Sequence, residues 1–134
     1  MRAIILESFD SGPALHEVPT PQFAPNELLV RVHASSVNPV DAAIAGGMLK
    51  DMVEHEFPVV LGRDYAGVVE QVGSNVTRYA VGDEVYGSMP AANPTVHDGT
   101  WAELIVVPES MATRKPDGVD TASAGATVIA PGLP

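Results

Sequence analysis

The stretch that decides the fold is GRDYAGVVEQVG, residues 62–73. Within it, residues 65–72 predict a strand, because aromatic and β-branched residues are bounded by Gly62 and Gly73. Residues 28–36, LLVRVHASS, predict a second long strand. Its alternating positions are Leu28, Val30 and Val32 on one side and Leu29, Arg31 and His33 on the other. Such alternation is typical of a strand with one buried face, so we expect a fold built on β-strands.

Further elements are predicted on both sides of these strands. Asn38 can cap a short helix at residues 39–45, which starts with proline and is followed by a Gly-Gly pair. An Ala-rich segment at residues 121–127 predicts a second helix, capped by Asp120. Additional strands are predicted at residues 2–7, 15–18, 81–87 (after a turn) and 101–107, one possible helical turn within 48–56, and a loop at 90–99. Many short strands with few helices indicate a mainly β, barrel-like or sandwich architecture.

Length and composition narrow the class of protein. The 134 residues fit one hydrophobic core, and 46% of them are apolar. A formal net charge of −10 argues against a nucleic-acid-binding surface, which must be cationic. We expect no membrane partner and a cytoplasmic location, because the chain has neither a long apolar segment nor a signal-peptide pattern. The absence of cysteine excludes disulfides, thiolate nucleophiles and every Cys-containing zinc site.

Motifs for nucleotide binding and hydrolysis are missing from the sequence. It contains no G-x-G-x-x-G, no G-x-x-x-x-G-K-[ST], no H-E-x-x-H and no G-x-S-x-G. A loop that cradles nucleotide phosphates is therefore not expected in this chain.

Four segments, in this order and spacing, indicate a family. They are VRVHASSVNPVD at 30–41, PVVLGRDYAGVVEQVG at 58–73, VGDEVYG at 81–87 and GTWAE at 99–103. Together they resemble the N-terminal GroES-like domain of medium-chain dehydrogenases/reductases, in the quinone-oxidoreductase-like branch. The resemblance implies a GroES-like, partly open β-barrel over residues 1–119. It also implies that residues 120–134 begin the connection to a Rossmann domain absent from this chain, with the active site between the two domains.

The resemblance makes zinc catalysis unexpected. In zinc-containing relatives a Cys stands at the position of Asn38 and a G-H-E motif at that of Gly62-Arg63-Asp64. Here the thiolate is replaced by an amide and the imidazole by a guanidinium, which is not a metal ligand. We therefore expect no metal at Asn38, Arg63 and Asp64.

Without a metal, a substrate carbonyl must be polarised by hydrogen bonds or by the cofactor. Asn38 is the candidate donor, and the alternative is that it only caps the following helix. Asp41, the second catalytic candidate, either orients a partner residue or simply occupies the helix's first turn, where an acidic residue is favoured. Arg63 and Asp64 are expected near the cleft, although Arg63 could instead pair with Asp64 or Asp41. Ala43 stands where many quinone-reductase relatives have a Tyr, which implies a roomier pocket, and Tyr65 is expected to pack in the core.

The resemblance implies an NADPH-dependent enzyme that reduces a quinone or an α,β-unsaturated carbonyl by hydride transfer. Its partners would be a small-molecule substrate and NAD(P)H, the latter bound mainly by the Rossmann domain. The alternatives are a stand-alone GroES-like binding module and, less favoured, a co-chaperonin. The intact protein is expected to be a homodimer. This chain alone is expected to be inactive and either monomeric or weakly self-associating through Val128, Ile129 and Leu133.

Overall fold

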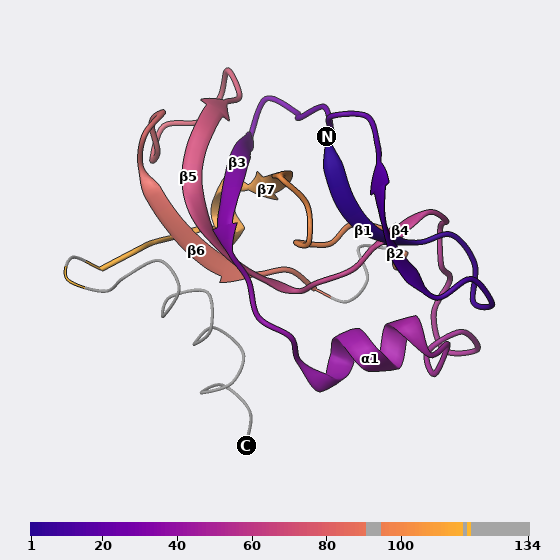
Figure 1. Ribbon diagram of the computed structural model, residues 1–134. Coiled ribbons are helices and arrows are strands. Elements are labelled where there is room, and N and C mark those ends of the chain that lie inside the picture. The colour runs from indigo at the N-terminus through magenta and orange to yellow at the C-terminus, as the bar shows by residue number, and fades with distance from the viewer. Residues whose placement is uncertain (91–94, 117, 119–134) are drawn as a thin grey trace.

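The computed structural model describes residues 1–90, 95–116 and 118. The described part is mainly β, with one α-helix, and its elements follow one another as shown in Figure 1. They are β1 (Arg2–Leu6), β2 (Pro13–Glu17), β3 (Glu27–Ala34), α1 (Pro39–Ala45), β4 (Val59–Val60), β5 (Asp64–Val72), β6 (Glu84–Ser88), β7 (Leu104–Pro108), the 3₁₀ turn η1 (Glu109–Met111) and β8 (Thr113–Arg114). No helix in this part of the chain has the length and apolarity of a membrane span.

The strands form two antiparallel sheets that do not close into a complete barrel. The first has the order β2-β1-β4, and the second has the order β7-β3-β5-β6-β8. The two strands that the alternation pattern identifies, β3 and β5, are neighbours at the centre of the larger sheet. This arrangement confirms the predicted partly open, GroES-like β architecture.

Two apolar clusters hold the sheets together. The first is the core of the larger sheet, with Leu28, Val30, Tyr65, Val69, Val85, Ile105 and Val107 buried in it. The second lies between the smaller sheet and α1 and contains Leu6, Ile44, Val59, Leu61 and Val96. Because α1 buries Ile44 in this second cluster, the short helix is fixed against the smaller sheet (Figure 1).

Several strand boundaries differ from the predictions; β2, for example, spans Pro13–Glu17 rather than residues 15–18. β1 ends at Leu6, and β3 ends at Ala34, because Ser35 and Ser36 leave the ladder and use their hydroxyls to bind Asp64. β7 begins at Leu104 rather than at residue 101. The segment 48–56 contains the predicted helical turn, closed by a hydrogen bond from the Val53 N–H to the Leu49 carbonyl at 3.1 Å. The helix predicted at 121–127 and the boundary at 119/120 lie outside the described residues.

Candidate functional site

Asn38 lies at the junction where the chain leaves β3 and enters α1. It occupies the N-cap position of the helix, and Pro39 is the first helical residue. The Asp41 carboxylate Oδ2 accepts a hydrogen bond from the Asn38 backbone N–H at 2.7 Å, and the Asp41 backbone N–H donates to the Asn38 carbonyl at 2.9 Å. These reciprocal bonds fix the start of the helix, as the sequence predicts for a cap position.

The side chain of Asn38 binds two residues from other segments. Its amide Nδ2 donates to Asp64 Oδ2 at 2.8 Å and to Ser36 Oγ at 3.1 Å. The Ser36 hydroxyl in turn donates to the same carboxylate oxygen of Asp64 at 2.5 Å. We call Ser36, Asn38 and Asp64 the Asn38 network; it ties the end of β3 to the first residue of β5.

Asp64 is the buried anchor of this network. Its side chain is fully buried, and Ser35 also binds it, through a hydrogen bond from the Ser35 hydroxyl to the Asp64 main-chain carbonyl at 2.5 Å. A buried carboxylate loses its hydration, so the hydrogen bonds to Oδ2 are charge-assisted and compensate for that loss. The second oxygen, Oδ1, has no hydrogen-bond partner among the described residues. Asp64 therefore lies beneath the surface and does not itself line an open cleft.

Asp41 lies close to the network and is also buried. Burial raises the pKa of its carboxyl above the usual 3.8; the hydrogen bond from the Asn38 N–H and the charge of Arg63 act in the opposite direction, whereas the charge of Asp64 raises the pKa further. The helix therefore starts with a carboxyl group that is harder to ionise than an exposed one.

Arg63 has a structural environment. Its side chain is only 1% exposed, and its guanidinium donates to three main-chain carbonyls. Nη1 binds the carbonyl of Pro90 at 2.6 Å, and Nη2 binds the carbonyls of Asp98 at 2.6 Å and Val60 at 3.2 Å. Pro90 and Asp98 lie at the two ends of the predicted 90–99 loop, so Arg63 joins both ends to the residues around β4.

This environment agrees with the structural role that the sequence left open for Arg63, although its hydrogen-bond partners are main-chain carbonyls rather than Asp64 or Asp41. Among the described residues it forms no ion pair within 4 Å with Asp64 or Asp41, and it does not face a cleft. Three main-chain carbonyls accept hydrogen bonds from Nη1 and Nη2 of Arg63, whereas Ser36 and Asn38 bind Oδ2 of Asp64. Arg63 Nε and Asp64 Oδ1 have no hydrogen-bond partner among the described residues. Burial lowers the pKa of Arg63, and the nearby charges of Asp41 and Asp98 partly offset this effect.

The two remaining predicted residues have simpler roles. Tyr65 is fully buried in the core of the larger sheet, and burial raises the pKa of its hydroxyl. This confirms that Tyr65 packs in the core. Ala43 is half-buried on α1, one turn beyond Pro39.

The donor atoms at the positions of the zinc ligands do not suit zinc. Asn38 points its amide nitrogen at a carboxylate, and Arg63 places a cation between carbonyls. Neither atom can coordinate a cation in this arrangement, because each is a hydrogen-bond donor. At these three positions only the Asn38 amide oxygen and the Asp64 carboxylate remain as oxygen ligands, without the sulfur and nitrogen ligands of a zinc site. These residues therefore do not fit the metal, and we derive no chemical step through zinc.

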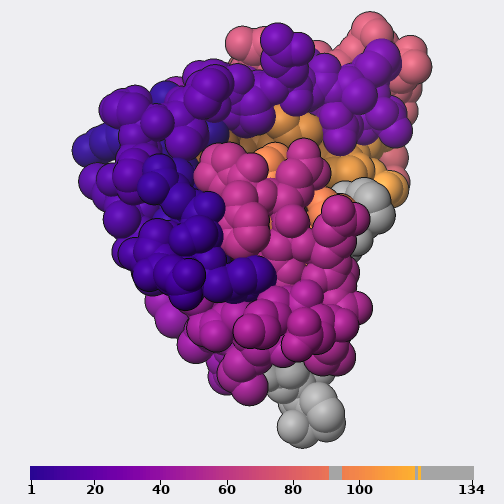
Figure 2. All heavy atoms as spheres, turned by 90° about the vertical axis from the view of Figure 1, so that its right-hand side faces the viewer, coloured from indigo at the N-terminus to yellow at the C-terminus, as the bar shows by residue number. Residues whose placement is uncertain are grey.

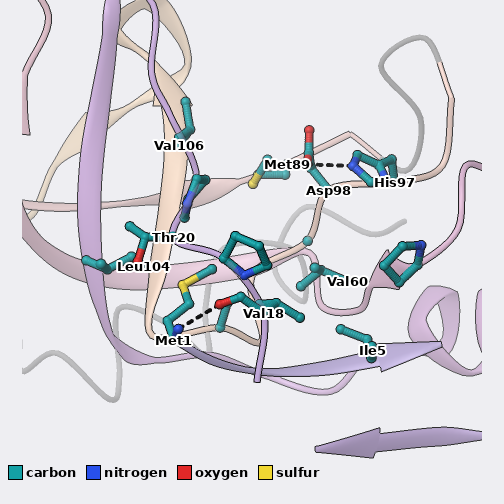
Figure 3. A pocket seen from close by; sticks show the side chains of 15 residues that line it. Met1, Ile5, Val18, Thr20, Val60, Met89, His97, Asp98, Leu104 and Val106 are labelled. Carbon is teal, nitrogen blue, oxygen red and sulfur yellow. Dashed lines mark hydrogen bonds and ion pairs between the residues drawn. The ribbon is translucent and has the colours of Figure 1, made fainter. Parts of the chain in front are cut away.

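A separate apolar cavity of about 280 Å³ lies between the two sheets. Figure 3 shows Ile5 of β1, Val60 of β4 and Leu104 and Val106 of β7 around it, with Met1 and Met89 nearby. In Figure 2 the indigo and purple N-terminal segments and the magenta middle of the chain share one face, with orange residues of the β7 region visible between them. None of the residues of the Asn38 network lines this cavity.

Sequence reasoning identified Asn38 and Asp64 but missed Ser36. Serine is common at strand ends, and the importance of Ser36 depends on the approach of β5, which no local pattern reveals. The cavity was also missed, because its lining comes from distant parts of the chain.

Comparison with known proteins places this geometry in a family. Residues 24–117 match the family described as the alcohol dehydrogenase GroES-like domain. The chain belongs to this family. The predicted family resemblance is therefore confirmed. The Asn38 network lies inside the matched region of this GroES-like domain.

Individual relatives agree with this assignment. The chain is 39% identical over 104 residues to the human protein named NAD(P)H oxidoreductase RTN4IP1, mitochondrial, covering 69% of this chain and 25% of that protein. It is 34% identical over 114 residues to the quinone-oxidoreductase homolog, chloroplastic, of Spinacia oleracea, covering 85% and 33%. The solved quinone oxidoreductase from Coxiella burnetii superposes with a TM-score of 0.79 at 30% identity, covering 95% and 41%. This GroES-like domain thus spans well under half the length of these relatives.

Proposed function

We propose that this GroES-like domain forms the substrate side of a two-domain NADPH-dependent reductase that acts on a quinone or an α,β-unsaturated carbonyl. The observation that carries the proposal is the Asn38 network, a built polar site at the β3–α1 junction. The names of the relatives, NAD(P)H oxidoreductase and quinone oxidoreductase, support the reaction class.

The chemistry would be divided between the two domains. When bound, NADPH supplies the hydride, and the sequence of this chain contains no motif for its phosphates. We therefore propose that a Rossmann domain holds most of the cofactor, as the greater length of the relatives allows.

In the proposed reaction, the role of this chain is to position the hydride acceptor. Asn38 is itself buried, with 9% of its surface exposed, and it lies between the half-buried Ser36 and the helix. A donor here would bind the acceptor oxygen and stabilise the negative charge that develops on it during hydride transfer. Asp41 and Asp64 would act by fixing Asn38, because Asp41 binds its backbone N–H and Asp64 binds its side-chain amide.

The proposal is tested in the intact protein, expressed from its complete gene, by following NADPH oxidation with duroquinone and with cyclohex-2-enone. Replacing Asn38→Ala removes the donor, so we expect kcat/KM for the better acceptor to fall about 100-fold. Asn75→Ala removes an exposed amide in a turn after β5 and serves as the matched control. Equal activity of the two variants would contradict the assignment of the site.

A further inference from the structure

The apolar cavity between the two sheets has walls that come from both of them. Ile5 of β1 and Val60 of β4 belong to the smaller sheet, whereas Leu104 and Val106 of β7 belong to the larger one (Figure 3). Ile5 and Leu104 are buried, and Val60 and Val106 are half-buried. In the described part of the chain, every strand residue that lines the cavity is therefore apolar.

The polar side chains of the cavity come from its loops and are few, namely Thr20, His97 and Asp98. Thr20 and Asp98 are exposed, so they lie at the opening rather than in the interior. The His97 ring is engaged within the fold, since its Nδ1 is 2.7 Å from the carbonyl oxygen of Glu56. An apolar interior with a few polar groups is the usual composition of a small-molecule binding site.

The charges at the cavity disfavour an anionic ligand. Among the described residues, no Lys or Arg side chain lines it. The Met1 ammonium is already bound by the Val18 carbonyl at 2.7 Å and by the Glu17 carboxylate at 3.4 Å. Asp98 places a carboxylate at the opening, in a chain whose formal net charge is −10. An anion would meet repulsion there, whereas an uncharged apolar molecule gains free energy by leaving water.

The size of the cavity sets the size of the ligand. Its volume is about 280 Å³. A dry apolar cavity of roughly 150 Å³ accepts benzene, which has a single ring. The cavity between the sheets therefore has room for two fused rings.

We propose that this cavity is a binding site for an uncharged, mainly apolar molecule of about the size of two fused rings. The site is separate from the Asn38 network, none of whose residues lines the cavity, so this inference does not depend on the proposed function. Because the walls belong to both sheets, a ligand bound there would join β1 and β4 to β7 and stabilise the folded chain.

The test is an NMR titration with 2-naphthol of the 134-residue chain labelled with ¹³C at its methionine methyl groups. Met1 and Met89 line the cavity, whereas Met48 and Met52 are exposed on the segment after α1. We expect the Met1 and Met89 signals to shift and saturate with a Kd of about 0.1–1 mM, because an aromatic ring shifts only nearby atoms. Met48 and Met52 should not shift, and they report any binding to exposed apolar side chains.

A second ligand tests the expected charge. 2-Naphthoate has the same two rings and carries a negative charge at neutral pH. We expect it to bind at least tenfold more weakly than 2-naphthol. Equal affinities would contradict a site for uncharged molecules.

Cavity filling tests the location of the ligand. Val106→Phe places a larger side chain in the cavity and should raise the Kd for 2-naphthol at least tenfold. Val68→Phe is the matched control, because Val68 is a half-buried valine of the same sheet that does not line the cavity. Circular dichroism checks that both variants fold, and the methionine shifts of the unmodified chain decide the question if Val106→Phe does not.

Three results would overturn the inference. The first is a shift of Met48 and Met52 as large as that of Met1 and Met89, which would indicate surface association. The second is equal binding of 2-naphthol to folded Val106→Phe and Val68→Phe. The third is a shift of Met1 and Met89 in this chain but not in the intact protein, which would show that another part of the protein fills the cavity. NADPH oxidation is assayed separately, so none of these results decides the proposed function.

Discussion

The role of a single residue in this domain depends on which groups it contacts in the folded chain, and Arg63 is the clearest example. In the sequence it stands beside Asp64 and suggests an ion pair or a cleft residue. In the structure it binds three main-chain carbonyls instead. These three bonds make Arg63 important for the stability of the fold.

Replacing Arg63→Met leaves those carbonyls without donors inside the fold. We expect the free energy of unfolding to drop by roughly 2–4 kcal/mol, because buried hydrogen bonds from a charged group are lost. Urea unfolding followed by circular dichroism measures the loss. Arg31→Met is the control, since Arg31 forms an exposed ion pair with Glu70, worth about 1 kcal/mol or less. Equal losses for the two variants would contradict the structural role of Arg63.

The raised pKa of Asp41 predicts that the free energy of unfolding depends on pH. The pKa of its carboxyl is raised above 3.8 in the folded chain, so the folded state binds this proton more tightly than the unfolded state. Its contribution to stability is therefore present at low pH and is lost as the pH rises from 3.8 through the folded pKa. Asp41→Asn removes this effect, so the variant should gain stability relative to the unmodified chain over that interval.

Urea unfolding of both proteins between about pH 3.5 and pH 7, conditions chosen to span the interval, measures this difference. Asp51→Asn, on an exposed turn, controls for the loss of one negative charge. A difference between Asp41→Asn and the unmodified chain that stays constant with pH, or that changes in the opposite direction, would show that Asp41 is not the residue responsible.

At the scale of elements, the contact between β3 and β5 organises the larger sheet. Gly67 of β5 lies so close to β3 that an added Cβ would be 2.1 Å from the carbonyl oxygen of Arg31. Two backbones can approach this closely only where one residue has no side chain.

Gly67→Ala should therefore destabilise the chain by roughly 2–4 kcal/mol, because the neighbouring backbone must move to make room. Gln71→Ala, at an exposed position of the same strand, should change stability by about 0.5 kcal/mol or less. Thermal unfolding of the two variants provides the comparison. If the Gly67→Ala protein were as stable as the Gln71→Ala protein, β5 would have room for a side chain at residue 67. That result would contradict the 2.1 Å distance between an added Cβ and the carbonyl oxygen of Arg31.

The same elements show what the sequence could predict. β3, β5 and α1 were predicted because alternation, glycine boundaries and a cap–proline pair are local signals. The two-residue strands β4 and β8 were not, because two residues cannot show a period. Likewise, β3 ends early because Ser35 and Ser36 bind Asp64, a contact made only after the sheet has formed.

At the scale of the whole molecule, the family resemblance predicted Asn38 and Asp64 as site residues. The fold then brings these two residues together with Ser36. Asn38 and Asp64 are 26 residues apart, and their bond depends on β3 and β5 being neighbours. The described part of the domain contains the buried Asn38 network and two apolar clusters. For hydride transfer we propose that it needs a second domain, consistent with its covering only 25% of the human relative and 41% of the Coxiella burnetii enzyme.

The most direct test of the two-domain proposal compares NADPH oxidation by the 134-residue chain with that by the intact protein from the complete gene. Both are assayed at equal molar concentration with duroquinone or cyclohex-2-enone. We predict that the chain alone stays at the rate of the buffer while the intact protein turns over. Turnover by the chain alone at a rate comparable with the intact protein would contradict the claim that this domain is only the substrate side of the active site.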